Sequence, residues 1–416
     1  MRAQSLFESD RLTMERSIAL TAEALRAYRE RYAHWAIGYS GGKDSSATVT
    51  LVAYLIETGQ VSKPETLRIL YADTGMELPT LNFSALSLID SLRRRGFDAE
   101  VVKPILDQRF FVYMFGRGVP PPAPHFRWCT GTLKIEPMRR ALEAHAVSLG
   151  FGEIVENEKG ALVYRGFGDE KLLMLTGVRL GESAARDARI VLSCSKDSGE
   201  CGQGYLQKSA KEGLNDVLAP LVHWRVCHVW DWLMLYQPEH GFETRLVAEV
   251  YGIDEEGSTA ESDARTGCIQ CNVAKKDTAF DNILKKPHWQ YLRPLKRLRP
   301  LYAELREPRL RLRKFGERNV AGELVKNQGR LGPLTFEARQ YGLSEVIKIQ
   351  DEINEAARQQ NRPTISLIDS EELNRIEELI AAKTFPDKWT GEEDRGDVRR
   401  EKLFSDGTVQ NILFGD

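Results

Sequence analysis

A glycine loop that combines charge with hydroxyl groups occupies residues 40–46, where the sequence reads Ser-Gly-Gly-Lys-Asp-Ser-Ser. Gly41 and Gly42 allow a backbone to approach a phosphate closely, and Lys43 adds a positive charge. The loop lies between a predicted strand and a predicted helix, so helical N–H groups and the helix dipole would also face an anion. Further donors are the hydroxyls of Ser40, Ser45 and Ser46. We predict a phosphate-binding loop unlike the G-x-x-x-x-G-K-[ST] loop of kinases; a plain strand-to-helix turn is the alternative.

Four of the six cysteines have a spacing that suits metal binding. Cys268 and Cys271 place two thiolates on one tight turn, a geometry that zinc sites and iron–sulfur sites both use. Cys194 and Cys201 lie in a loop that contains glycine and serine, and they complete a set of four if the fold brings that loop across. We predict a [4Fe–4S] cluster on these four thiolates, with zinc or buried unligated thiols as the alternatives.

The bulk composition is that of an ordinary soluble protein, with 42% hydrophobic and 28% charged residues. A length of 416 residues is enough for two domains. The net charge of −2 gives no general attraction to nucleic acid, so a polyanion would need a local basic patch. Residues 1–16 contain no uninterrupted apolar segment, so we expect neither a signal peptide nor a membrane span and place the protein in the cytoplasm.

The order of the predicted elements indicates an α/β fold. Apolar runs predict strands, and segments with helical periodicity predict helices between them. The resulting β-α-β-α-β order implies a doubly wound, mostly parallel sheet whose C-terminal strand ends form the ligand-binding rim. The expected strands are residues 35–39, 66–72, 99–103, 171–178 and 217–222, and the expected helices are residues 11–33, 45–57 and 78–95.

The sequence changes character along its second half. Residues 151–169 are rich in glycine and predict an irregular surface excursion, and from residue 288 onward the pattern is helical and charged. We therefore divide the chain into a domain of residues 1–274, which holds the glycine loop and the cysteine-rich insert, and a helical C-terminal region of residues 275–416.

The glycine loop resembles that of the PP-loop ATP pyrophosphatases, and Asp73-Thr74-Gly75-Met76-Glu77 is similar to the Asp-Thr-Gly-x-Glu segment of their PAPS reductase-like branch. The resemblance implies an adenine nucleotide alpha hydrolase-like fold and cleavage of ATP between its α and β phosphates. It assigns catalysis to Lys43 and Asp44, and nucleotide contacts to Asp73, Thr74 and Glu77. It also implies Mg²⁺, with Asp44 or Asp73 as a ligand; a place near a helix N-cap is the alternative role of Asp73.

Four further segments resemble DndC-type DNA phosphorothioation proteins: Arg127-Trp128-Cys129-Thr130, Leu175-Thr176-Gly177-Val178-Arg179, Gly267-Cys268-Ile269-Gln270-Cys271 and Leu331-Gly332-Pro333-Leu334-Thr335. The resemblance implies nucleotide contacts from Gly177 and Arg179. It supports a cluster, although those proteins usually carry another cysteine shortly before the CxxC and residues 262–266 have none. It makes Cys129 a persulfide-accepting nucleophile, or a cluster ligand in place of Cys194 or Cys201. Cys227 falls where the family begins a helix under the sheet, so we expect it in the core.

The resemblance implies that ATP adenylates a DNA phosphate oxygen and that sulfur then displaces AMP. The implied partners are a cysteine desulfurase as sulfur donor, other DNA phosphorothioation proteins and DNA itself, without a membrane. Residues 293–318 contain ten Lys or Arg against three Glu, with Tyr302 and Phe315 interleaved, which predicts either a DNA contact or a solvated helical face.

Other functions remain open. They are PAPS or adenylylsulfate reduction, tRNA thiolation, and a non-catalytic nucleotide-binding regulator. Reduction is disfavoured because residues 272–416 contain no cysteine, and because Trp128-Cys129 stands where the cluster-bearing adenylylsulfate reductases have paired cysteines. The intact glycine loop disfavours a regulator, because a regulator could lose the loop.

Overall fold

The structure is a computed structural model that divides the chain into two compact units. The first unit comprises Met1–Asp73, Leu78–Lys103 and Ile135–Thr266, and the second comprises Thr74–Glu77, Pro104–Lys134 and Gly267–Asp416. This division differs from the predicted one at residue 274, because residues 104–134 group with the C-terminal part. The structure describes residues 12–158, 160–168, 170–181, 187–188, 199–200, 205–209, 213–251, 268–273, 277–314, 322–323, 330–386, 388–398, 401–403 and 409–411.

A seven-stranded sheet forms the centre of the first unit, in the order β3-β2-β1-β6-β9-β8-β7. The five strands from β3 to β9 run parallel, and β8 and β7 add an antiparallel edge. The predicted α/β fold is confirmed. The strands are β1 (His34–Tyr39), β2 (Thr66–Ala72), β3 (Asp98–Val102), β6 (Leu172–Leu175), β7 (Gly199–Glu200), β8 (Tyr205–Gln207) and β9 (Asn215–Ala219).

The strand order reverses beside β1, because β2 and β3 extend the sheet to one side and β6 and β9 extend it to the other. Ligands of open α/β sheets bind at such a switch point, outside the carboxyl ends of the strands. The glycine loop follows β1 directly and residues 176–179 follow β6, so both lie at this position.

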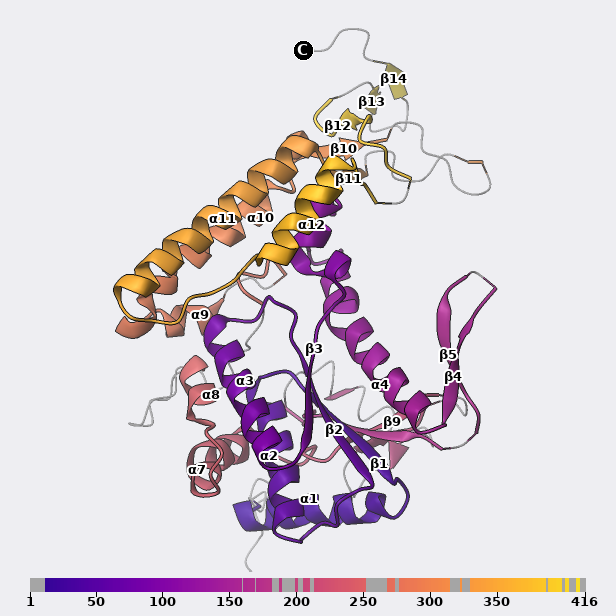
Figure 1. Ribbon diagram of the computed structural model, residues 1–416, viewed down its shortest axis with the longest axis vertical. Helices are drawn as coiled ribbons and strands as arrows, with labels where there is room; N and C mark the ends of the chain where they lie inside the picture. The colour runs from indigo at the N-terminus through magenta and orange to yellow at the C-terminus, as the bar shows by residue number, and fades with distance from the viewer. Residues whose placement is uncertain are drawn as a thin grey trace, which may run out of the picture. The chain divides into compact units, whose positions relative to one another are not determined.

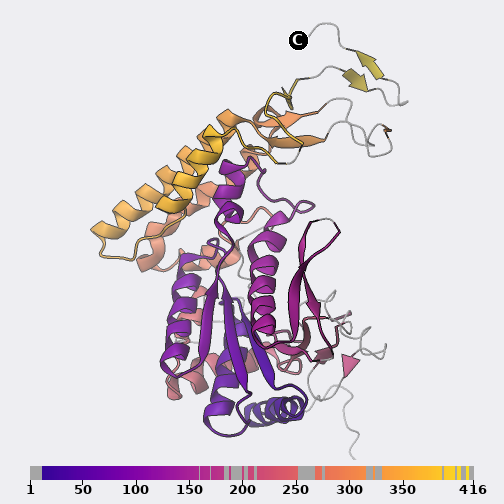
Figure 2. The same ribbon diagram turned by 45° about the vertical axis from the view of Figure 1, so that its right-hand side comes forward.

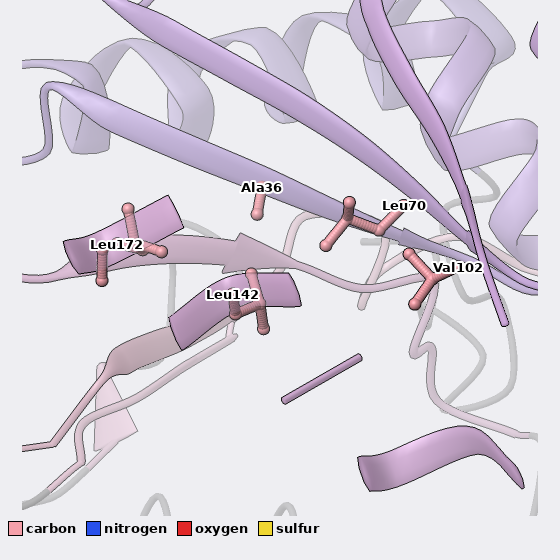
Figure 3. Packing of buried hydrophobic residues seen from close by; sticks show 6 residues of the cluster. Ala36, Leu70, Val102, Leu142 and Leu172 are labelled. Atoms are coloured by element: carbon pink, nitrogen blue, oxygen red, sulfur yellow. The ribbon is translucent and has the colours of Figure 1, made fainter. Parts of the chain in front are cut away.

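Helices cover both faces of the sheet. Ala36, Leu70, Val102 and Leu172 of the strands pack against Leu142 of α4 in one core cluster (Figure 3). On the opposite face, Tyr39 contacts Ser46 of α2 and Tyr71 contacts Asn82 of α3 through their hydroxyl groups. The helices of this unit are α1 (Met14–Arg29), α2 (Lys43–Glu57), α3 (Pro79–Arg94), α4 (Glu136–Ser148), α6 (Val226–Asp231), η4 (Trp232–Tyr236), α7 (Gln237–Glu239) and α8 (Arg245–Val250).

A β-hairpin replaces the irregular excursion that we predicted at residues 151–169. β4 (Gly152–Glu156) and β5 (Leu162–Gly166) pair antiparallel over five residues each, beside α4 (Figure 2). The prediction was wrong because the glycines lie at the strand ends and in the turn, and the strands between them are short mixtures of apolar and charged residues, Gly-Glu-Ile-Val-Glu and Leu-Val-Tyr-Arg-Gly. A two-stranded ribbon of this kind has too few apolar positions to give a clear pattern.

The second unit is mainly helical, and its two longest helices are α11 (Phe336–Gln359) and α12 (Ser370–Ala381) (Figure 1). It also contains a three-stranded sheet, β11-β10-β12, and the hairpin β13–β14, so the expectation of helices alone was incomplete. Its other elements are η1 (Leu106–Gln108), η2 (Val112–Gly116), α9 (Thr278–Ile283), η5 (Pro287–Arg297), α10 (Leu298–Glu304), η6 (Pro308–Leu310), β10 (Arg311–Arg313), β11 (Leu331–Leu334), β12 (Asp394–Arg395), β13 (Glu401–Leu403) and β14 (Val409–Asn411). A π-helical turn, η3 (Thr130–Ile135), ends where the first unit resumes. Over the described ranges, no helix is both long enough and apolar enough to cross a membrane.

Candidate functional site

The glycine loop of the first unit is shaped by its own backbone and hydroxyl groups. Gly41 has a φ of +76°, a conformation that residues with a Cβ rarely adopt. Gly42 caps α2 without a side-chain hydrogen bond, so the cap residue leaves the first N–H groups of the helix to other partners. Ser45 Oγ accepts a hydrogen bond from Ser40 N–H at 3.2 Å and donates one to the Gly42 carbonyl at 3.0 Å. The predicted phosphate loop therefore has the geometry of an anion site at the start of a 15-residue helix.

Asp44 joins the two cations of this loop. Arg179 Nε donates to Asp44 Oδ1 at 2.6 Å, and Lys43 Nζ lies 3.4 Å from Asp44 Oδ2. Lys43 and Arg179 are both buried, whereas the Asp44 side chain keeps 20% of its surface exposed. Two cationic side chains and one carboxylate thus lie together beside the helix N-terminus, where a phosphate can be bound.

Tyr251 is a residue of this site that the sequence did not single out. Its hydroxyl accepts a hydrogen bond from the Lys43 backbone N–H at 3.3 Å. Its ring lies against the Lys43 ammonium, with 4.9 Å from Nζ to the ring centroid, which is within the range of a cation–π contact. Tyr251 thus fixes both the backbone and the side chain of Lys43, although 208 residues separate the two in the chain.

Gly177 and Asp73 lie at the carboxyl ends of β6 and β2. A Cβ added at Gly177 would lie 2.8 Å from the Asp44 carbonyl carbon and 2.9 Å from Ser45 N, so only glycine allows this approach to the loop. Asp73 is buried and its Oδ2 lies 3.3 Å from Lys103 Nζ. Both residues belong to the first unit, whereas Thr74 and Glu77 belong to the second unit.

Residues 74–77 pair with the CxxC turn of the second unit. Glu77 forms an isolated antiparallel bridge with Cys268, and Ile269 N–H donates to the Met76 carbonyl at 2.6 Å. The Glu77 carboxylate accepts hydrogen bonds from Thr74 N–H and Thr74 Oγ1, at 3.1 and 2.7 Å. The nucleotide role predicted for Thr74 and Glu77 stays a prediction, while their contacts hold the cysteine turn in place.

Three cysteines of the second unit line one pocket: Cys129, Cys268 and Cys271. Cys271 N–H donates to the Cys268 carbonyl at 3.3 Å, which closes the tight turn that the CxxC spacing predicts. The remaining wall is mostly apolar and comprises Met76, Phe110, Pro122, Leu133, Ile269, Asn272 and Tyr302. Of the two roles predicted for Cys129, this arrangement supports that of a ligand, because it brings Cys129 to the CxxC.

The pocket disfavours free thiolates. Burial raises the pKa of Cys268 to about 12, with Lys134 opposing the shift and Glu77 adding to it. Burial, followed by the proximity of Cys271, also raises the pKa of Cys129. A thiol with a raised pKa is a poor nucleophile at neutral pH, whereas metal binding would displace its proton. The donor set of three soft sulfur ligands in a largely apolar pocket fits an iron–sulfur cluster.

Of the other three cysteines, Cys227 alone lies among the described residues. Cys194 and Cys201, the first two predicted cluster ligands, lie outside the described residues. Cys227 is half-buried at the start of α6 in the first unit, so the helix expected there is present but Cys227 is not fully in the core. Within the described ranges, no group of three His, Cys, Asp or Glu side chains could hold a single metal ion.

Five of the ten basic residues predicted to contact DNA have the following partners within the second unit. Three form ion pairs with carboxylates on other elements, and two donate hydrogen bonds to backbone carbonyls. These are Lys296 with Asp281, Arg297 with Glu352 and Lys314 with Glu393, then Arg311 with the Gly332 carbonyl and Arg306 with the Pro121 carbonyl. Tyr302 is buried in the thiol pocket, and Phe315 and Arg318 lie outside the described residues. The stretch therefore offers less free positive charge than its composition indicates.

Comparison with known proteins agrees with this architecture. Residues 34–238, just under half of the chain, match the family model of the phosphoadenosine phosphosulfate reductase domain. The chain contains a PAPS reductase-like domain. This domain includes the glycine loop, Gly177, Arg179 and Cys129, whereas Cys268 and Cys271 follow it.

Individual similarities to the PAPS reductase-like domain are distant. An uncharacterized protein of Methanocaldococcus jannaschii is 22% identical over 199 residues, which are 47% of this chain and 35% of that protein. The match thus spans about a third of that relative's length.

Three solved structures have TM-scores between 0.29 and 0.33, too low to bear on the chemistry of this chain. A PAPS reductase from Candida auris, in a phosphate complex, is 14% identical, and the match covers 55% of this chain and 88% of that one. The Candida glabrata FMN adenylyltransferase in complex with FMN and the ATP analogue AMPCPP is 16% identical, with 64% and 68% covered. The U34-tRNA thiolase NcsA from Methanococcus maripaludis with its [4Fe-4S] cluster is 16% identical, with 70% and 80% covered.

Proposed function

We propose that this chain is an ATP pyrophosphatase that transfers sulfur, with DNA backbone phosphate as the acceptor. The observation that carries the proposal is the buried Lys43, held at the N-terminus of α2 by Asp44 and Tyr251. Such a fixed cation beside helical N–H groups matches the charge of a departing pyrophosphate. The PAPS reductase-like domain that contains this loop is consistent with nucleotide chemistry.

In the proposed reaction, an acceptor oxygen attacks the α phosphorus of ATP and pyrophosphate leaves. Lys43 and the first N–H groups of α2 would bind the β and γ phosphates, where negative charge builds up as the bond breaks. Because Asp44 and Tyr251 already orient Lys43, little reorganisation is needed when that charge develops. Arg179 would remain paired with Asp44 and keep the loop closed against residues 176–179.

Magnesium would be held by the phosphates of ATP and by Asp73. Mg²⁺ usually takes one or two carboxylates together with substrate phosphates and water. Both carboxylate oxygens of Asp44 face cations, at 2.6 and 3.4 Å, so Asp44 is the weaker of the two predicted ligands. Asp73 is buried at the carboxyl end of β2, with its Oδ2 3.3 Å from the ammonium of Lys103, whose side chain is 58% exposed. We therefore assign Asp44 to holding Lys43 and Arg179.

The sulfur chemistry would belong to the thiol pocket, with Cys129, Cys268 and Cys271 as the ligands of an iron–sulfur cluster. A cluster bound there would supply redox-active iron with a high affinity for sulfur. The protein's own contribution is to bury the thiols, exclude water with apolar side chains and fix the CxxC turn through Met76 and Glu77. A fourth cysteine ligand, if the cluster has one, would be Cys194 or Cys201.

DNA is the acceptor that the four segments similar to DndC-type proteins favour, with a cysteine desulfurase as the source of sulfur and other phosphorothioation proteins as partners. A thiol reductant from outside the chain would first reduce the persulfide from the desulfurase to hydrosulfide, which would then attack the adenylated phosphorus, form the P–S bond and release AMP. Assimilatory reduction, tRNA thiolation and a non-catalytic regulator remain the competing functions. The ion pairs along residues 293–314 mean that DNA binding must be tested directly and does not follow from that stretch.

Substitution of Lys43 tests the nucleotide chemistry. Lys43→Met keeps the bulk against Tyr251 but removes the charge, so pyrophosphate release from ATP should fall by about 10²-fold or more. Release would be measured with the full chain, Mg²⁺ and duplex DNA. Lys63→Ala is the matched control, because Lys63 is an exposed lysine of the same unit that lies over the Phe97 ring, and it should leave the rate unchanged. Equal release by Lys43→Met and the native chain would contradict the proposal.

A further inference from the structure

The hydroxyl group of Tyr302, on α10 of the second unit, is buried without a hydrogen-bond partner among the described residues. Tyr302 is only 2% exposed and lines the thiol pocket. A buried tyrosine hydroxyl normally finds a partner, because leaving it without one forfeits the hydrogen bond it made to water. This one therefore calls for an explanation.

Two other polar side chains near Tyr302 in the same unit have partners, whereas Gln108 Oε1 and Arg109 Nε, which precede Phe110, have none among the described residues. Trp128 Nε1 donates to the Pro120 carbonyl at 3.0 Å while its ring stacks on Phe110, with 5.4 Å between centroids. Tyr291 donates its hydroxyl to the Pro363 carbonyl at 3.0 Å. Phe110 in turn meets the Tyr302 ring edge-on, with 5.8 Å between centroids. The aromatic side chains fix the Tyr302 ring while its hydroxyl stays available.

Tyr302 shares this pocket with three thiols. Cys129, Cys268 and Cys271 line the same cavity, and the rest of its wall, apart from Asn272, is apolar. A phenol with an ordinary pKa of about 10 is a neutral donor at physiological pH, so it suits an acceptor that carries negative charge. A sulfide or thiolate sulfur of a bound cluster is such an acceptor.

We propose that Tyr302 donates a hydrogen bond to a sulfur atom of the cluster held by Cys129, Cys268 and Cys271. It is a positioning and tuning residue and takes no part in bond making. The inference rests on the proposed cluster and goes beyond it, since it states how this chain sets the cluster's properties. Because a donor stabilises the form with more negative charge, it raises the reduction potential.

The test compares Tyr302→Phe with Tyr291→Phe in the full chain, reconstituted anaerobically with iron and sulfide. Removing the Tyr302 hydroxyl should shift the midpoint potential to a more negative value and should reduce the gain in melting temperature that the cluster provides. In the cluster-free chain it should leave the melting temperature unchanged or raise it, since no hydrogen bond is lost there. Tyr291→Phe should lower the melting temperature equally with and without the cluster, and should leave the potential unchanged.

Three outcomes would overturn the inference. They are an unchanged potential in Tyr302→Phe, a loss of stability in its cluster-free form as large as that of Tyr291→Phe, and failure of the native chain to take up iron. The first outcome would also follow if the hydroxyl held only a water molecule. None of these outcomes would contradict the proposed nucleotide chemistry, because that chemistry is tested separately by pyrophosphate release in Lys43→Met. Conversely, a shifted potential in a chain that releases no pyrophosphate would support the proposed role of Tyr302 and contradict the proposed reaction.

Discussion

Asp44 shows most clearly what single residues contribute at the nucleotide loop. Its place in the glycine loop, together with the resemblance of that loop to PP-loop ATP pyrophosphatases, is enough to predict a role near phosphate. Its partner Arg179 lies 135 residues away, and the Lys43 partner Tyr251 lies 208 residues away. Pairings at such separations depend on how the strands are ordered in the sheet, and no local pattern of residue types contains them. The loop was therefore predictable, and the ion pairs that hold it were not.

Cys129 carries the residue-scale prediction about the metal. Because it lines the same pocket as the CxxC turn, Cys129→Ser should lose as much bound iron as Cys268→Ser. Iron and sulfide content of the anaerobically purified chain is the measurement. Cys227→Ser is the matched control, since Cys227 lies on α6 of the first unit, and it should keep the native iron content.

Full iron content in Cys129→Ser would remove Cys129 from the ligand set. Stoichiometric zinc in a chain without iron would show that these cysteines bind zinc and not an iron–sulfur cluster. The same measurement on Cys194→Ser and Cys201→Ser identifies a fourth cysteine ligand if there is one.

At the scale of elements, buried strands were the easiest to predict. β1, β2 and β6 are mostly buried, so the apolar runs in their sequences stand out from the rest of the chain. β2 was predicted with the bounds that the structure has. The β4–β5 hairpin and the short strands β10–β14 were missed, because strands of two to five residues outside the large buried sheet leave too short a pattern to detect.

Arg339 fixes the long helix α11 and provides the prediction at this scale. It is fully buried and its guanidinium donates to the carbonyls of Phe115, Gly116 and Thr384. Burial lowers the pKa of Arg339 to about 10, so its charge is held by these carbonyls without an acidic partner. Arg339→Ala would leave the carbonyls unpaired and should cost about 3 kcal/mol or more of unfolding free energy.

The measurement for Arg339 is the urea unfolding of the full chain. Arg358→Ala is the control on the same helix, because Arg358 is 62% exposed and pairs only with Glu355. A change within about 0.5 kcal/mol is expected there. A similarly small effect of Arg339→Ala would show that the three hydrogen bonds do not stabilise the second unit.

For the whole molecule, the important feature is that the chain crosses between its two units several times. Residues 74–77 and 104–134 leave the PAPS reductase-like domain's sheet and join the C-terminal part. A boundary drawn from composition is a single cut along the sequence, so it could not separate these segments. As a result, the nucleotide loop lies in one unit, and Cys129 joins Cys268 and Cys271 in the other.

This division predicts that the two halves of the reaction respond to different substitutions. Lys43→Met should abolish both pyrophosphate release and DNA modification, because no adenylated phosphate forms. Cys268→Ser should still release pyrophosphate in vitro but should leave the DNA without sulfur. The measurement is mass spectrometry of nuclease-digested DNA from cells that lack the gene and are supplied with the native chain, either variant, or Cys227→Ser as the control.

Phosphorothioate dinucleotides should appear only with the native chain and Cys227→Ser. Their presence with Lys43→Met would separate DNA sulfur from the glycine loop and refute the proposed order of steps. If they were absent from every strain while pyrophosphate release in vitro was normal, the ATP pyrophosphatase activity would be supported, and the sulfur acceptor would be a molecule other than DNA. Loss of pyrophosphate release in Cys268→Ser would mean that the two units do not act independently, because the buried thiol pocket would then be required for the first chemical step as well.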